Sequence, residues 1–355
     1  MKNKKMENKY NKFILVFFLS FFILIISFVA TIIYIDPFYH YHSPIAPIKF
    51  MQENEAYQNV GIAKNLVYDS ILTGSSMTEN FKVSQFNQLF ECDTVKLSVS
   101  GGRLPNYEII LNEALKNDKI KIKNIFYGCD IYSYINDPNG AVEHEIPQYL
   151  YDDNIFTDVK YILNKTVMFS HALPLLKNSI NNSIQDVDYS YVWYMDYNFS
   201  KTSAMKNYIR QNSEEKKPAD IFDESVKINC EKIGKYIKQN PDIEFNIFFP
   251  PYSILYYDYF NRMGKLEALL YSQEMVTEYF LQFPNVKLSS FFADENIICN
   301  LDNYKDYSHY SERINEYMVK KMKTGEYELN NDNYKQYFEQ ARNFLCNYDY
   351  EQLFE

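Results

Sequence analysis

A serine and a distant aspartate–histidine pair are the residues of this sequence that could do chemistry together. Ser76 lies in a Gly-Ser-Ser-Met-Thr run that separates a short apolar segment from a helix-like one. A serine on such a tight turn presents its hydroxyl beside backbone N–H groups. Its hydroxyl needs a base, because it is a poor nucleophile at neutral pH. His309 could be that base, and Asp306, three residues earlier, could orient it.

Each of these residues also has a simpler interpretation. Ser76 could cap a helix, although Thr78 precedes the helix-like run directly and is the better cap. Ser75 is an alternative nucleophile on the same turn. Asp306 could form a local Asx turn, and His309 could lie in solvent at the start of a helix. The triad interpretation therefore depends on whether the fold brings Ser76 to His309.

The pattern of the chain predicts an α/β fold that would do this. Short apolar runs predict strands at 70–73, 94–99, 123–127, 244–249 and 286–290. Helix-like segments alternate with them or follow them, at 83–90, 107–117, 227–239, 263–283, 311–323 and 332–346. Such alternation predicts about five parallel strands with helices on both faces, a three-layer sandwich. In these sheets the active site lies at the carboxyl ends of the strands.

The N-terminal region predicts a membrane anchor. Residues 13–35 carry no charge and, as a helix, span roughly 30 Å of hydrocarbon. Five lysines precede them, so residues 1–12 are expected to be a cytoplasmic tail and the rest extracytoplasmic. A cleaved signal peptide is the alternative, but its apolar core is usually shorter and no small-x-small site follows. Residues 36–66 would form a juxtamembrane strap.

The main domain is expected at 67–325. Within it, residues 131–226 are too long for an ordinary crossover and predict a helical insert that acts as a lid. Residues 326–355 would add a C-terminal helix and tail.

The second residue pair of interest follows Pro250-Pro251, which end the fourth predicted strand. Tyr252 and Ser253 would lie at the active-site edge and could bind substrate, or could have a purely structural role.

Charge and cysteine content narrow the ligand classes. The formal net charge is −10, and five of the 36 lysines and arginines precede residue 13, so the remainder is more acidic still. This argues against nucleic acid as a partner. The five cysteines show no paired spacing, which indicates scattered thiols rather than a disulfide framework or a metal site. No metal or organic cofactor is expected.

The blocks resemble those of the SGNH (GDSL-like) hydrolase superfamily, whose fold is flavodoxin-like. Gly74 to Thr78 is similar to its first block, with serine in place of aspartate and the nucleophile position on Ser76. Gly101 is similar to the glycine of the second block, whose N–H helps to bind the oxyanion; it could equally be a turn glycine. Asp306 and His309 match the last block. The resemblance covers about residues 67–325.

The third block departs from the family pattern. The family has an asparagine that donates to the oxyanion, whereas Asp130 stands there in this chain. An ionised carboxylate would oppose a developing negative charge. The resemblance therefore implies either that Asp130 is protonated, or that it orients another donor, or that the N–H groups of Ser76 and Gly101 suffice.

Together with the anchor, the resemblance is to an extracytoplasmic subset that includes the teichoic-acid D-alanylation protein and polysaccharide O-acetyltransferases. It implies a serine-dependent acyl-ester hydrolase or O-acyltransferase acting on an envelope or secreted polysaccharide. Its partners would be the cell membrane, an acylated glycan or cell-wall polymer, and a multi-pass membrane acyltransferase. The alternative is a non-catalytic envelope protein that binds glycan or scaffolds such an acyltransferase.

Overall fold

The computed structural model describes all residues except 1, 139, 141–145 and 153. The chain divides into two compact units. Unit 1 comprises Met1–Met51, Ala56–Leu66 and Ile146–Gln185. Unit 2 comprises Gln52–Glu55, Val67–Glu145 and Asp186–Glu355, and it contains every residue of the candidate triad.

Unit 1 is built around the N-terminal helix α1 (Lys2–Ile35). Its part from Asn8 to Ile35 is long and apolar enough to cross a membrane. Near the C-terminal end of α1, buried apolar side chains form a small core, and the Tyr161 hydroxyl donates to Asp36 Oδ1 at 2.7 Å. The other elements assigned to this unit are α2 (Glu55–Asn65), α6 (Gln148–Tyr151), α7 (Val159–Ile162), a π-helical turn η2 (Val167–Ala172) and α8 (Leu173–Ile180).

The predicted insert 131–226 is divided between the two units. Its part Ile146–Gln185 clusters with the N-terminal residues of unit 1, whereas the part that follows clusters with the sheet of unit 2. The reason is packing, since Leu150, Tyr161 and Val167 share one apolar core with Ile32 of α1. The described residues therefore do not form the single helical lid that the length of the insert indicated.

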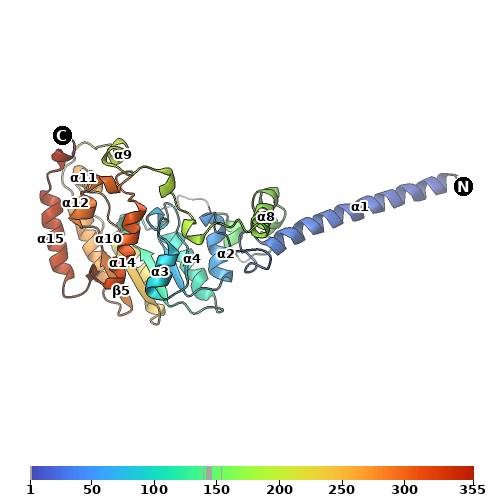
Figure 1. Cartoon of the computed structure of the whole chain (residues 1–355), viewed down its shortest axis with the longest axis horizontal. Helices are drawn as coiled ribbons and strands as arrows, with labels where there is room; N and C mark the ends of the chain where they lie inside the picture. Colours follow the sequence, from blue (N-terminus) through green and yellow to red (C-terminus); the bar gives the residue numbers. More distant parts are fainter. Residues whose placement is uncertain (1, 139, 141–145, 153) are drawn as a thin grey trace. The chain divides into compact units, whose positions relative to one another are not determined.

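Unit 2 contains a six-stranded sheet in the order β2-β1-β3-β4-β5-β6. Figure 1 labels β5 of this sheet. The first five strands are parallel, which confirms the predicted α/β class, and β6 is antiparallel to β5. Their central residues are apolar and almost fully buried, as expected for a sheet covered on both faces. The strands are β1 (Ser70–Thr73), β2 (Thr94–Lys96), β3 (Asn124–Gly128), β4 (Glu244–Phe249), β5 (Val286–Ser290) and β6 (Glu328–Leu329).

The helices of unit 2 fall into two groups by their contacts. Helices α3 (Val83–Phe90) and α14 (Glu312–Thr324) pack on each other. In the second group, α10 (Asp223–Gln239) contacts α4 (Leu104–Lys116) and α12 (Leu266–Phe280). The remaining α-helices are α5 (Ile131–Ile135), α9 (Lys201–Lys206), α11 (Ile254–Arg262), α13 (Glu295–Ile298) and α15 (Tyr334–Asn347). The 3₁₀ turns are η1 (Ser76–Thr78), η3 (Val187–Tyr189), η4 (Tyr194–Asp196), η5 (Leu301–Asn303) and η6 (Tyr350–Leu353).

One helix prediction needs correction. The helix expected at 263–283 is the shorter α12, which begins at Leu266, because Gly264 before it has a φ of +65° that no helix accommodates; a separate helix, α11, ends at Arg262. Residues 326–355 contain the expected C-terminal helix as α15, which packs on α12, and they also supply β6, which pairs with β5.

Candidate active site

The carboxyl ends of three neighbouring strands supply the residues of the candidate site. Ser76 follows β1, Gly101 follows β2 and Asp130 follows β3. The sheet order reverses at this point, because β2 lies on one side of β1 and β3 on the other. A crevice forms outside the strand ends wherever the crossovers leave in opposite directions, and ligands of open α/β sheets bind there.

The turn after β1 is held in a conformation that exposes Ser76. Gly74 has a φ of +150°, and a Cβ placed there would lie 2.6 Å from Thr78 Cγ2. The Ser75 side chain caps η1 by accepting the N–H of Met77 at 3.3 Å. The Thr78 hydroxyl donates to the Ser75 carbonyl at 2.8 Å. The cap of η1 is therefore Ser75, and the N-cap of α3 is Lys82, so neither Ser76 nor Thr78 is the cap considered from the sequence, and the Ser76 hydroxyl is left for other contacts.

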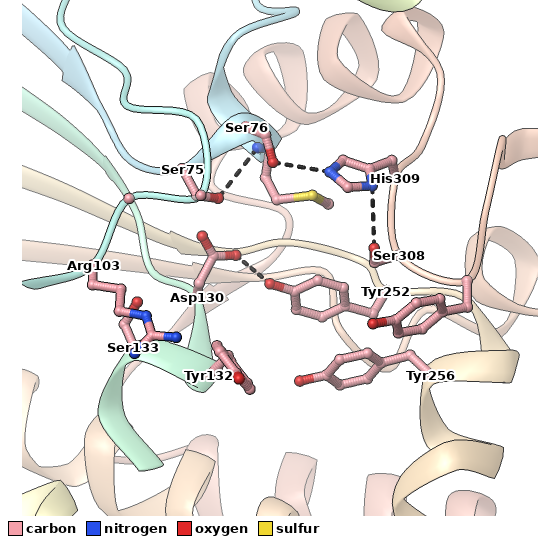
Figure 2. Close-up of a pocket in the computed structure, with 14 residues that line it drawn as sticks. Ser75, Ser76, Arg103, Asp130, Tyr132, Ser133, Tyr252, Tyr256, Ser308 and His309 are labelled. Atoms are coloured by element: carbon pink, nitrogen blue, oxygen red, sulfur yellow. Dashed lines mark hydrogen bonds between the residues drawn. The ribbon is translucent and has the colours of Figure 1, made fainter. Parts of the chain in front are cut away.

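The fold brings Ser76, His309 and Asp306 together. Figure 2 shows the Ser76 side chain directed at the His309 ring. The Ser76 Oγ lies 2.9 Å from His309 Nε2, and His309 Nδ1 lies 2.8 Å from Asp306 Oδ2. With the proton on Nδ1, the imidazole donates to the carboxylate and its Nε2 accepts from the serine hydroxyl. This is the hydrogen-bond order that a Ser-His-Asp triad requires.

Asp306 makes its Asx turn as well as its contact with the imidazole. Its Oδ1 accepts the backbone N–H of Ser308 at 2.9 Å and of His309 at 2.8 Å. Burial opposes ionisation, but the contacts with the His309 ring and these two N–H groups outweigh it and hold the pKa of Asp306 well below its ordinary value. Asp306 is therefore a carboxylate that can stabilise a protonated imidazole.

A pocket of about 210 Å³ opens beside Ser76 and His309. Gly101, Asp130 and Tyr252 line it, as predicted from the sequence, together with Arg103 and the rings of Tyr132, Tyr256 and Tyr307. Ser253 does not line it: its buried hydroxyl donates to the Tyr307 carbonyl at 2.6 Å. The pocket is thus walled by aromatic rings on one side, where a sugar ring or an acyl chain could pack.

Two backbone N–H groups are available for an oxyanion. Among the described residues, neither the Ser76 nor the Gly101 N–H has a hydrogen-bond partner, and both residues line the pocket. Gly101 has a φ of +58°, so its interpretation as a turn glycine also holds.

Asp130 is buried at the wall of the same pocket. The Tyr252 hydroxyl donates to its Oδ1, while its Oδ2 has no hydrogen-bond partner among the described residues. Burial raises the pKa of Asp130, against the lowering effects of the Ser75 and Tyr252 hydroxyls and of His309. The environment thus favours the protonated acid, which can donate a hydrogen bond where an ionised carboxylate cannot.

One contact of the triad was not predicted from the sequence. The Trp193 indole N–H donates to the Ser76 carbonyl at 3.0 Å, and its ring lies edge-on to the His309 ring with centroids 5.2 Å apart. Trp193 belongs to the long connection between β3 and β4, whose sequence has no regular period. The only available signal was that it is the single tryptophan of the chain.

Within the described part of the chain, no group of three or more histidine, cysteine, aspartate and glutamate residues is placed to hold a metal ion. All five cysteines are free thiols.

No protein-family model matches this sequence, and no curated protein matches it either. The function of this chain is therefore inferred from the geometry of the site.

Proposed function

We propose that this chain is a serine-dependent acyl-ester hydrolase or O-acyltransferase of the SGNH type. The observation that carries the proposal is the Ser76–His309–Asp306 hydrogen-bond chain, with 2.9 Å and 2.8 Å links, at the mouth of a pocket. The parallel strand order β2-β1-β3-β4-β5 supports it, since this is the flavodoxin-like order. No step in it requires a metal or an organic cofactor.

In the proposed reaction, His309 Nε2 takes the proton of Ser76 as its Oγ attacks the acyl carbonyl. The imidazolium stays bonded to the Asp306 carboxylate and then gives its proton to the leaving alkoxide. An acyl-serine remains. Water, activated by His309, releases the acid, whereas a sugar hydroxyl in place of water gives transfer.

Charge on the carbonyl oxygen would be stabilised by the N–H groups of Ser76 and Gly101. A protonated Asp130 would be the third donor, in the position where the superfamily carries asparagine. Such donors act in a water-poor site, where each is worth on the order of 100- to 1000-fold in rate.

The substrate proposed is an acyl ester on an envelope or secreted polysaccharide or cell-wall polymer. The helix of unit 1 supports a membrane anchor, with the N-terminus cytoplasmic and unit 2 outside. A multi-pass acyltransferase in the same membrane would supply acyl groups if the reaction is transfer.

The test is covalent labelling of the full chain in detergent with a fluorophosphonate probe, followed by peptide mass spectrometry. We expect the label on Ser76, and we expect Ser76→Ala to abolish labelling and ester hydrolysis. Ser75→Ala is the matched control, because it removes the neighbouring hydroxyl but not the nucleophile.

A wild-type chain that takes no label, or a Ser76→Ala chain that keeps full esterase activity, would contradict the proposal. The non-catalytic alternative, a glycan-binding or scaffolding protein, would then be favoured.

A further inference from the structure

We infer that Trp193 is a positioning residue that holds the nucleophile and its base at reacting distance. Trp193 lies in a segment that we call the arm, residues 187–206, which runs from η3 to α9 within unit 2. The arm is attached to both halves of the Ser76–His309 pair. The inference rests on the proposed function only where reaction rates are concerned.

The first attachment is to the nucleophile turn. The Trp193 indole N–H donates to the carbonyl of Ser76 itself at 3.0 Å. Asn80, just beyond η1, is almost fully buried, and its Oδ1 accepts the backbone N–H of Trp193 at 3.1 Å and of Tyr194 at 3.3 Å. These bonds fix the indole relative to the peptide plane from which the Ser76 side chain projects.

The second attachment is to the loop that carries the base. The Trp193 and His309 rings meet at 84° with centroids 5.2 Å apart. The Lys305 ammonium lies 4.2 Å from the Trp193 ring centroid and 3.7 Å from that of Tyr197, a cation–π contact with both. A backbone hydrogen bond adds to this attachment: the Ser200 N–H donates to the Tyr304 carbonyl at 3.1 Å.

Trp193 therefore contacts both the Ser76 turn and the His309 loop, two segments of unit 2 that are far apart in the sequence. The other links between the Ser76 turn and the His309 side are the Ser76–His309 bond, which must break and re-form during the reaction, and two bonds to the Met77 carbonyl, from the Tyr310 hydroxyl at 3.2 Å and the Asn315 amide at 3.4 Å. A misplacement of about 1 Å can cost on the order of 100-fold in rate. Trp193 does not line the pocket, so its effect should fall on the rate of chemistry rather than on substrate affinity.

The kinetic test compares three variants of the full chain in detergent. Trp193→Phe keeps a ring but loses the N–H donor, and we expect labelling of Ser76 and kcat to fall about 2- to 10-fold, the worth of one net hydrogen bond. Trp193→Ala loses both contacts, and we expect a fall on the order of 100-fold. KM should stay within about twofold in both. Tyr197→Phe is the matched control, since it alters the arm without touching Ser76 or His309, and should keep wild-type rates.

The second test does not depend on activity. Trp193 is the only tryptophan of the chain, so the tryptophan fluorescence of the protein comes from the indole that lies beside the His309 ring. An imidazole ring in contact with an indole changes the surroundings that set the indole emission. We expect the emission spectrum of the wild-type chain to differ from that of the folded His309→Asn chain, which lacks this ring.

The outcomes separate the two proposals. Wild-type rates in a folded Trp193→Ala chain, or an emission spectrum that is the same in wild type and His309→Asn, would overturn the positioning role. If the wild-type chain takes no fluorophosphonate at all, the proposed function fails, and the difference in emission alone then decides whether Trp193 contacts His309.

Discussion

In the proposed reaction, the protonation state of Asp130 decides how strongly the site stabilises the oxyanion. The pKa of Asp130 is raised by burial, so this residue keeps its proton above the ordinary range of an aspartate and loses it as the pH rises through the raised value. Oxyanion stabilisation by Asp130 should therefore be present below this raised pKa and lost as the pH rises through it.

We predict that kcat/KM for p-nitrophenyl acetate falls in the wild-type chain as the pH rises through the raised pKa of Asp130 and shows no such fall in Asp130→Asn. The amide of asparagine donates at every pH, so the ratio of variant to wild type should grow with pH toward the 100- to 1000-fold worth of one donor. The measurement is a pH–rate profile of both chains.

Tyr252→Phe provides the matched control for this prediction. It removes the hydroxyl that donates to Asp130 Oδ1 and that favours the ionised form. The acid should then keep its proton longer, and the fall should move to higher pH. A fall that is unchanged in Asp130→Asn would show that Asp130 is not the third donor.

Single residues of the site were predictable from sequence to the extent that local pattern defines them. Ser76 stands on a glycine-serine turn and Asp306 precedes His309 by three residues, so each could be recognised from its neighbours. Trp193 could not, because its contact with Ser76 depends on how a connection without periodicity folds back across η1. Ser253 was expected at the active-site edge, but it does not line the pocket, because the backbone of the loop directs its hydroxyl to the Tyr307 carbonyl.

At the scale of elements, the β1–η1 turn is the part on which the nucleophile depends. Gly74 combines a φ of +150° with close packing against Thr78 and the Gly128 carbonyl. We predict that Gly74→Ala lowers the melting temperature, at a cost of about 1–3 kcal/mol for the strained backbone, and slows Ser76 labelling at least 10-fold. Thermal unfolding and labelling kinetics would check this.

Gly325→Ala serves as the comparison for that change. Gly325 also has a positive φ, +70°, but an added Cβ would meet only Glu328 Oε2, at 3.5 Å, and it lies at the C-terminal cap of α14. It should lower stability and leave the labelling rate unchanged. An equal loss of labelling in both variants would mean that general destabilisation, not the turn, controls the nucleophile.

The sequence predicted helices and strands correctly where several apolar residues follow one another with a regular spacing. The bounds of β1, β4 and β5 agree with the predicted runs, and those of α3 agree as well. β6, with two residues, is too short for a period of two to show. Helix α11 was missed because Pro250-Pro251 precede it and its tyrosines give no clear polar face. The split between the two units was not predictable, since it depends on long-range packing.

At the scale of the whole molecule, the orientation of the anchor decides where the site can work. The lysines before residue 13 and the apolar helix after them favour a cytoplasmic N-terminus. We predict that protease added to intact protoplasts removes a C-terminal tag and spares an N-terminal one. Lysed protoplasts, in which both tags should be cut, are the control. Protection of the C-terminal tag in intact protoplasts would mean that the orientation is reversed.

The wide separation of Ser76 and His309 along the chain also bears on how the protein is made. Their hydrogen bond spans 233 residues, and contacts of such long range form late because loop closure must come first. If the proposed function holds, a chain still emerging from the ribosome has Ser76 long before it has His309, so Ser76 has no base until the C-terminal part of unit 2 has been synthesised and folded. Labelling of Ser76 would then report that the folding of this site is complete.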